Sequence, residues 1–248
     1  MFKSLRVRLS QGTQVIADVR TAKPAGFRGL PRIAEGACAT GCTACIAACP
    51  TNAIRLDPVS IDLGRCTFCG DCAVVCPEAK FELTSEPRMG AVSRSDLVVT
   101  AGDDATTKVR ANLGLAKLFK RSLKLRQVSA GGCNGCELEL NASANVNFDL
   151  SRFGIEWVAS PRHADALVIS GTLTRTMRDA VRLAWDAMPE PRFVIAVGAC
   201  AISGGLYEGA RGVERGFLDD VIPALYVPGC PPHPLTFVNA ILDLLGVA

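Results

Sequence analysis

The chain has 248 residues, of which 49% are hydrophobic and 21% are charged. This composition suits one or two globular domains with buried cores. The formal net charge is only +3, so the overall charge gives no indication of nucleic-acid binding. We expect no secretory signal peptide and no membrane-spanning helix, because no apolar run of about 18 residues occurs. The twelve cysteines are therefore expected to bind metal or to carry out redox chemistry in a reducing compartment, rather than to form disulfides.

Two similar cysteine runs occupy the first third of the chain, CATGCTACIAACP and CTFCGDCAVVCP. Their cysteines are Cys38, Cys42, Cys45 and Cys49 in the first run, and Cys66, Cys69, Cys72 and Cys76 in the second. The second run has the C-x2-C-x2-C-x3-C-P spacing of bacterial [4Fe–4S] ferredoxins, and the first run has one extra residue after Cys38. Zinc sites also use C-x2-C pairs, but they do not require two such dense runs that both end in Cys-Pro. The runs therefore predict two [4Fe–4S] clusters.

The spacing also predicts which thiols share a cluster. In ferredoxins of this kind, three thiolates come from one run and the fourth comes from the end of the other run. We expect the first cluster to bind Cys38, Cys42, Cys45 and Cys76. We expect the second cluster to bind Cys66, Cys69, Cys72 and Cys49. Small residues between these cysteines leave room for backbone N–H groups to approach the sulfur atoms.

A linker and a basic segment follow. Residues 84–107 are mostly small and polar, which is typical of a linker. Residues 108–126 contain no acidic residue, and their basic residues are Lys108, Arg110, Lys117, Lys120, Arg121, Lys124 and Arg126. Leu115, Leu118, Phe119 and Leu123 fall roughly on one helical face. Such a segment can lie on an anionic membrane surface, or it can pack on the protein itself or on a partner.

The last part of the chain alternates apolar strands with helices. The predicted strands are residues 124–130, 154–160, 166–171, 193–198 and 224–228, and the clearest predicted helices are residues 174–188 and 234–246. The strands are apolar without polar alternation, which indicates a parallel sheet that is buried on both faces. The pattern therefore predicts a doubly wound α/β domain.

The remaining four cysteines each follow one of these strands. They are Cys133, Cys136, Cys200 and Cys230. The carboxyl ends of parallel strands lie at one edge of a sheet, so we expect the four thiols to converge there. They could hold a third [4Fe–4S] cluster or a zinc ion. A redox disulfide would leave two of them unexplained. Glycines on either side of Cys133 allow a tight turn, and the helix that begins near Glu137 directs N–H groups toward an anionic ligand.

These motifs resemble known families. The two runs, with FRGLP at residues 27–31 before them, resemble the eight-iron subunits of respiratory complex I and formate hydrogenlyase. The set C-x-G-C-E, G-A-C-A-x-x-G-G and P-G-C-P-P, together with SPRHADALVISG, resembles the small subunit of [NiFe] hydrogenases. It also resembles the homologous complex I subunit that carries the terminal cluster. This second resemblance covers residues 125–248.

The resemblances imply a fold and a domain order. We expect an α+β dicluster ferredoxin-like domain with an N-terminal extension at residues 1–95, followed by a linker at 96–125. An α/β flavodoxin-like doubly wound parallel-sheet domain is expected at residues 126–248. Because the two families are normally separate subunits, the chain is interpreted as a fusion of them.

The resemblances also imply a function. Cys133 and Cys136 have the hydrogenase-like spacing, whereas the complex I branch has two adjacent cysteines there. The class with the best match is the membrane-bound, complex-I-like hydrogenases, such as formate hydrogenlyase. The chain would pass electrons through three [4Fe–4S] clusters to or from the [NiFe] centre of a separate large subunit.

The implied partners are that large subunit, membrane subunits resembling those of complex I, and a formate dehydrogenase, a CO dehydrogenase or a ferredoxin. No nucleic-acid partner is expected, and the implied location is the cytoplasmic face of the membrane. The alternatives are an electron-relay subunit of a complex-I-like quinone or ferredoxin oxidoreductase without nickel, and a free-standing electron carrier.

Two further residues are candidates for roles near the last cysteine site. Glu137 could relay protons at the interface with the large subunit, or it could be a carboxylate that the helix dipole favours at an N-terminus. His233 could donate a hydrogen bond to a cluster sulfur and tune its potential, or it could be an ordinary loop residue. No catalytic residue is predicted in this chain.

Overall fold

Short antiparallel strands form the N-terminal region of the computed structural model, which describes residues 2–103, 109–120 and 122–247. The strands are β1 (Pro31–Ile33), β2 (Ile54–Leu56), β3 (Val59–Asp62), β4 (Phe81–Leu83) and β5 (Val98–Thr100). β1 pairs with β4, and β3 pairs with both β2 and β5. The helices are α2 (Ala44–Ala48), α3 (Asp71–Val75) and the 3₁₀ turn η1 (Ser95–Leu97). Because β5 belongs to this sheet, the N-terminal region extends beyond residue 95, where the sequence had placed its end.

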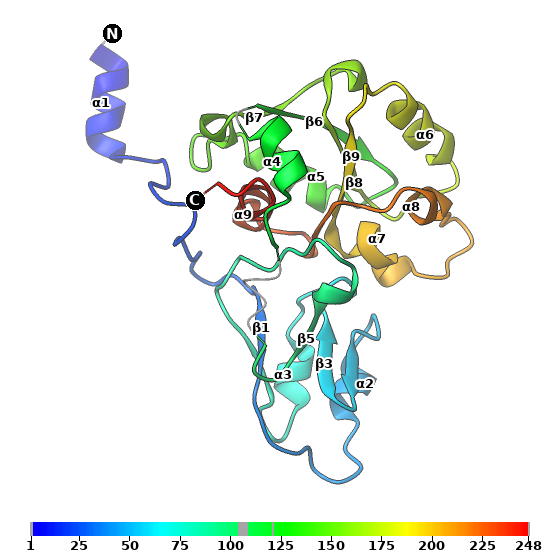
Figure 1. Ribbon diagram of the computed structural model, residues 1–248. Helices are drawn as coiled ribbons and strands as arrows, with labels where there is room; N and C mark the ends of the chain where they lie inside the picture. Colours follow the sequence, from blue (N-terminus) through cyan, green and yellow to red (C-terminus); the bar gives the residue numbers. More distant parts are fainter. Residues whose placement is uncertain (1, 104–108, 121, 248) are drawn as a thin grey trace.

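The C-terminal domain contains a five-stranded sheet whose neighbouring strands are all parallel (Figure 1). Its strands are β6 (Leu123–Ser129), β7 (Ile155–Trp157), β8 (Ala166–Ser170), β9 (Phe193–Val197) and β10 (Leu225–Val227). They lie in the order β10-β9-β8-β6-β7. This order is consistent with a flavodoxin-like α/β domain. Each strand overlaps a strand predicted from the sequence.

Helices cover both faces of this sheet. They are α4 (Leu113–Phe119), α5 (Gly135–Ala142), α6 (Arg178–Asp186), α7 (Gly198–Ser203), α8 (Gly216–Asp220) and α9 (Pro234–Leu244), with 3₁₀ turns η3 (Leu150–Phe153), η4 (Pro161–His163) and η5 (Gly205–Tyr207). One apolar core joins the sheet to α5 and α9, and a second core on the other face includes residues of α6 and α8. In the first core, Trp157 of β7 stacks on Phe237 of α9 with ring centroids 5.6 Å apart. Burial on both faces explains the continuous apolar character of the strands.

The two regions share a hydrophobic core. Ile61 and Phe68 of the N-terminal region belong to the same buried cluster as Ile202 and Tyr226 of the C-terminal domain. Ala91 and Tyr226 also exchange two backbone hydrogen bonds, of 3.0 and 2.8 Å, in an antiparallel bridge. This bridge satisfies part of the exposed edge of β10, as edge strands generally require.

The N-terminal extension packs on the C-terminal domain rather than on the ferredoxin-like region that follows it. Val19 is buried in the core of the C-terminal domain, and its carbonyl accepts a hydrogen bond of 2.8 Å from the side-chain amide of Asn239. Arg20 pairs with Asp243 and also donates to Asn239. Ahead of Val19 and Arg20 in the chain, α1 (Phe2–Gln11) has no buried residue and projects from the molecule (Figure 1).

The basic segment at residues 108–126 is not one amphipathic helix. Lys108 and Arg121 lie outside the described residues, and α4 is a short helix that Asn112 caps by accepting a hydrogen bond from the N–H of Leu115. The chain enters β6 at Leu123, because Leu123 and Leu125 are fully buried in the core on this inner strand of the sheet. Phe119 packs into the protein's own core, which favours the packing interpretation over the membrane-surface one. Among the described residues, no helix has the length and apolar character needed to cross a membrane.

Because Phe237 stacks on Trp157, truncating Phe237 is predicted to destabilise the C-terminal domain strongly. Phe237→Ala should lower the free energy of unfolding by about 3–5 kcal/mol, because it opens a cavity in a fully buried core. Both tryptophans lie in the C-terminal domain, so denaturant unfolding followed by tryptophan fluorescence measures this domain. Leu183→Ala on the exposed face of α6 is the control and should change the free energy by no more than about 0.5 kcal/mol. Equal losses for both variants would contradict the assigned core.

Candidate functional sites

The first group of thiols lies around α2. Cys38 and Cys42 are on the loop before α2, Cys45 is buried on α2, and Cys76 ends α3. Burial raises the pKa of the Cys45 thiol, and the nearby thiols of Cys76 and Cys38 raise it further. Cys76 thus lies beside the first cysteine run although it belongs to the second. This is the crossed arrangement expected for a ferredoxin.

The second group of thiols shows the reciprocal crossing. Burial raises the pKa of the Cys66 thiol to about 12, with contributions from Cys72, Cys49 and Cys69. Burial also raises the pKa of Cys72 to about 11. Cys49 of the first run therefore lies among the first three cysteines of the second run. The tight turn through these cysteines includes Phe68 and Gly70, both with positive φ.

Backbone N–H groups approach the sulfur atoms at equivalent positions of the two runs. The N–H of Ala53 donates to Cys49 Sγ at 3.2 Å, and the N–H of Lys80 donates to Cys76 Sγ at 3.4 Å. In each case the donor is four residues after the cysteine of a Cys-Pro pair. The two runs are therefore repeated in structure as well as in sequence. Hydrogen bonds to sulfur are among the factors that set the potential of a cluster.

The third group of thiols lines one cavity at the edge of the C-terminal sheet. Cys133 follows β6, Cys136 is in the first turn of α5, Cys200 is on α7 after β9, and Cys230 follows β10. Burial raises the pKa of Cys136, and Glu137 and the other three thiols add to this effect. Burial also raises the pKa of Cys200 to about 11. The structure therefore brings together four cysteines that are far apart in the sequence.

The cavity lies where the strand order reverses. After β6 the chain continues to β7 on one side, whereas after β8 it continues to β9 on the opposite side. The two connections therefore leave the sheet in opposite directions and leave a crevice between β6 and β8. The backbones are closely packed here: a Cβ atom added to Gly198 would lie 2.6 Å from Cys136 Sγ. A Cβ atom added to Gly171, after β8, would lie 2.5 Å from the backbone nitrogen of Gly132. Only glycine fits at either position, and both have positive φ.

Glu137 is buried at the wall of this cavity. Its Oε1 accepts hydrogen bonds from Ser129 Oγ at 2.7 Å and Ser170 Oγ at 2.8 Å. Burial alone would raise the pKa of Glu137, but the hydrogen bonds from Ser129, its own backbone N–H and Ser170 hold it below its ordinary value. Because Ser129 ends β6 and Ser170 ends β8, the carboxylate connects the two strands at the crevice.

His233 is placed as the cap of α9. Its Nδ1 accepts a hydrogen bond of 3.1 Å from the N–H of Leu235, and its ring lies 5.1 Å from that of Phe27 and 5.6 Å from that of Phe148. Burial lowers the pKa of His233. These contacts give it a structural role at the start of the helix.

Two positions that support the sites gave no local signal in the sequence. The guanidinium of Arg215 donates to the carbonyls of Cys200, Ala201 and Ile202 at 2.7–3.0 Å and so holds the end of α7. Arg65, the residue before Cys66, forms an ion pair with Glu208. Both depend on loops that meet only in the folded chain.

The donor chemistry of each group is four thiols, which fits a [4Fe–4S] cluster. Within residues 2–103, 109–120 and 122–247, no three His, Cys, Asp or Glu side chains are arranged to hold a single metal ion. Burial raises the pKa of the Cys66 and Cys200 thiols, and binding of a metal to such thiols releases their protons.

Comparisons with known proteins match both regions. Residues 37–81 match the 4Fe-4S dicluster domain, and residues 133–244 match the family described as NADH ubiquinone oxidoreductase, 20 kDa subunit. These findings support a dicluster domain and a 20 kDa-subunit domain in one chain. The interpretation of the chain as a fusion with a separate small subunit is therefore corrected: the chain is one subunit that contains both regions.

Three curated relatives are similar over part of their length. Formate hydrogenlyase subunit 7 of Escherichia coli is 41% identical over 146 residues, which are 58% of this chain and 56% of that protein. A probable membrane-bound hydrogenase subunit of Pyrococcus furiosus is 37% identical over 129 residues, 52% of this chain and 77% of that protein. An NADH-quinone oxidoreductase subunit of Desulfovibrio desulfuricans is 46% identical over 110 residues, 44% of this chain and 59% of that protein.

The chain thus spans little more than half the length of the first and third of these relatives. It covers more than two thirds of the second. All three relatives are subunits of oxidoreductase complexes, and the dicluster match supports two iron–sulfur clusters in this chain. The chain belongs to the family of the 20 kDa subunit of NADH ubiquinone oxidoreductase, a family of oxidoreductase-complex subunits.

Proposed function

We propose that the chain is an electron-transfer subunit of a membrane-associated, complex-I-like [NiFe] hydrogenase of the formate hydrogenlyase type. The observation that carries this proposal is the single cavity lined by four thiols beside a dicluster domain. Four thiols suit a third [4Fe–4S] cluster, and they also suit zinc. Because zinc has no redox chemistry, it would serve no purpose in an electron relay, so the neighbouring dicluster domain favours the cluster.

Each of the three groups of thiols is proposed to hold one cluster. Cys38, Cys42, Cys45 and Cys76 would hold the first cluster, and Cys66, Cys69, Cys72 and Cys49 the second. Cys133, Cys136, Cys200 and Cys230 would hold the third. Bound clusters of this kind supply one-electron transfer, with potentials that depend on burial and on hydrogen bonds to sulfur.

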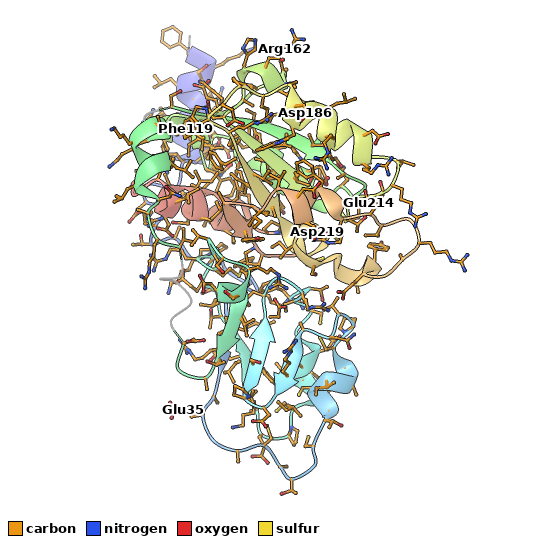
Figure 2. All side chains as sticks on the ribbon, turned by 45° about the vertical axis from the view of Figure 1, so that its right-hand side comes forward. Glu35, Phe119, Arg162, Asp186, Glu214 and Asp219 are labelled. Carbon is orange, nitrogen blue, oxygen red and sulfur yellow. The ribbon has the colours of Figure 1, made fainter. Side chains whose placement is uncertain are left out.

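The order of the sites along the molecule supports a linear relay. The loop that carries Cys38 and Cys42 lies at the end of the molecule away from the C-terminal domain, near Glu35 in Figure 2. At the other end of the N-terminal region, Cys69 and Cys230 line one cleft together with Phe68 and Met89. The second site is therefore the one that faces the C-terminal cavity. Phe68 and Met89 are both buried beside this cleft.

The branch of the family is proposed from the cysteine spacing. The identity to the complex I subunit, 46%, and to the formate hydrogenlyase subunit, 41%, does not separate the branches. The spacing Cys133-x2-Cys136 favours the hydrogenase branch. The alternative is an electron-relay subunit of a complex-I-like quinone or ferredoxin oxidoreductase without nickel, which would use the same three sites.

Exposed apolar residues near the cavity support a covering partner. Leu138 lies two residues after Cys136, and Leu206 and Tyr207 follow the glycine that packs on Cys200; all three side chains are exposed. We propose that a [NiFe]-type large subunit covers this face and that membrane subunits resembling those of complex I hold the assembly. The location would be the cytoplasmic face of the membrane, and the electron partner would be a formate dehydrogenase, a CO dehydrogenase or a ferredoxin.

Of the two roles considered for Glu137, we favour a structural one. Its carboxylate is held ionised by two serine hydroxyls at the ends of β6 and β8. Because its Oε1 already accepts both hydroxyl hydrogen bonds, we assign this group to shaping the crevice at the ends of β6 and β8. His233 is proposed to act through the position of α9, which it caps.

Removing one thiol of the third group should remove one cluster. Cys230→Ala is expected to abolish one of three [4Fe–4S] EPR signals in the anaerobically purified complex. Gly198→Ala should have the same effect, since its Cβ would lie 2.6 Å from Cys136 Sγ. Gly212→Ala, whose Cβ would have no neighbour within 4 Å, should keep all three signals. Three unchanged signals in Cys230→Ala would refute the ligand assignment.

Metal analysis of the complex should separate the two branches. The complex would be purified anaerobically through a tag on this chain. We expect nickel together with iron and sulfide, and hydrogen evolution or uptake by the same preparation. Iron and sulfide without nickel would instead support the quinone or ferredoxin oxidoreductase.

The role of Glu137 can be tested by two variants. Glu137→Gln keeps an acceptor for the serines and should lower the free energy of unfolding by about 1 kcal/mol, whereas Glu137→Ala should lower it by about 2–3 kcal/mol. The glutamine variant should retain electron transfer and hydrogenase activity. Glu139→Gln on the same helix is the control. Loss of activity in Glu137→Gln, with all EPR signals intact, would support proton relay instead.

A further inference from the structure

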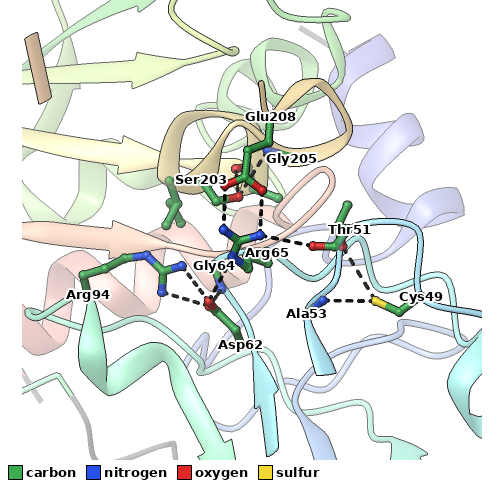
Figure 3. Close-up of polar contacts among 12 residues, drawn as sticks. Cys49, Thr51, Ala53, Asp62, Gly64, Arg65, Arg94, Ser203, Gly205 and Glu208 are labelled. Carbon is green, nitrogen blue, oxygen red and sulfur yellow. Dashed lines mark hydrogen bonds and ion pairs between the residues drawn. The ribbon is translucent and has the colours of Figure 1, made fainter. Parts of the chain in front are cut away.

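An ion pair between the two regions lies beside both the second thiol group and the C-terminal cavity. Arg65 Nη1 and Nη2 donate to the two carboxylate oxygens of Glu208, each at 2.6 Å (Figure 3). Arg65 directly precedes Cys66. Glu208 follows a loop in which a Cβ added to Gly205 would lie 3.1 Å from Cys200 Sγ. The ion pair therefore connects the backbone next to Cys66 with the loop around Cys200.

The turn that carries Arg65 is held in place from within its own region. Asp62 Oδ1 accepts a hydrogen bond of 2.9 Å from the N–H of Gly64. The guanidinium of Arg94 donates to both carboxylate oxygens of Asp62, at 2.8 and 2.7 Å. The N–H of Cys66 donates to the Asp62 carbonyl at 3.0 Å. The position of Cys66 is thus tied to the position of Arg65.

The same turn lies directly against the helix that carries Cys200. A Cβ atom added to Gly64 would lie 2.7 Å from Cγ2 of Ile202 on α7. Arg65 also reaches back to the carbonyl of Thr51, two residues after Cys49, at 3.4 Å. One side chain therefore contacts the segments beside two thiols of the second group and the loop of the third group.

We propose that this interdomain latch, defined as Asp62, Gly64, Arg65, Arg94, Ile202 and Glu208, sets the separation between the second and third clusters. Arg65 and Glu208 would be positioning residues for electron transfer between these clusters. The inference rests on the proposed function, because it requires a cluster in both groups.

The physical reason for this role is that electron tunnelling weakens steeply with distance, so small shifts of these loops change the transfer rate. The Arg65–Glu208 pair is partly exposed, and such pairs contribute little to stability. Its effect should therefore be on position rather than on folding.

The test uses the full chain in its anaerobically purified, reduced complex. The measurement is the magnetic interaction between the second and third clusters, seen as splitting or enhanced relaxation of their EPR signals. Glu208→Gln and Gly64→Ala should weaken this interaction, the first by releasing the loop and the second by forcing the turn away from Ile202. Iron content, and the unfolding midpoint of Glu208→Gln, should stay at wild-type values.

A charge reversal and two controls complete the design. Glu208→Arg should weaken the interaction more than Glu208→Gln, because it places a like charge opposite Arg65. Asp220→Asn removes the exposed Arg182–Asp220 pair of 2.7 Å, which joins α6 to α8 and includes no residue of the latch, and Gly212→Ala adds a Cβ in open space. Both controls should keep the wild-type interaction.

The outcomes separate the latch from the proposed function. Absence of the third EPR signal in the wild-type complex would overturn the proposed function, and the latch with it. Three signals with a wild-type interaction that persists in both Glu208→Gln and Gly64→Ala would overturn the latch alone. Weakening in these variants, greatest in Glu208→Arg, would establish it.

Discussion

The parallel pairing of the five C-terminal strands is the constraint on which the third thiol group depends. Parallel neighbours place the ends of β6, β9 and β10 at one edge of the sheet, and the thiols follow those ends. The reversal of strand order between β6 and β8 opens the crevice at that edge. Glu137 accepts hydrogen bonds from Ser129 and Ser170 at the ends of these two paired strands. Topology, rather than closeness in the sequence, therefore assembles this site.

The two ferredoxin-type groups are assembled differently, by local repetition. Each run forms a loop, a five-residue helix and a Cys-Pro exit, and the exits cross so that Cys49 and Cys76 join the opposite groups. Burial that raises the thiol pKa values opposes the charged form that a metal requires. Cluster binding must overcome this cost, so it is coupled to the folding of a region whose strands are only three or four residues long.

The sequence predicted the features that repeat locally or follow a period. All five parallel strands, the crossed thiol groups and the convergence of four distant cysteines could be predicted, because strand pattern and cysteine spacing encode them. The Arg65–Glu208 pair and the contacts of Arg215 could not, since they join loops through long-range side-chain geometry. The basic segment was misjudged as one helical surface because its periodicity continues into Leu123, where burial in the inner strand β6 overrides helix propensity. The packing of the N-terminal extension also had no signal in the sequence, because Val19 and Arg20 contact residues of α9, far away along the chain.

The way the two regions join determines how a relay would operate in this chain. The bridge between Ala91 and Tyr226 protects the edge of β10, the apolar cluster around Ile202 is shared, and the latch adds a polar contact at its rim. These are three different kinds of interaction, and together they fix one region against the other; Ala91 and Arg94 lie in the segment 84–107 that was predicted as a linker. The spacing of the second and third sites is then a property of the folded chain. A partner subunit would need to cover only the exposed side of the C-terminal cavity, where Leu138, Leu206 and Tyr207 are exposed.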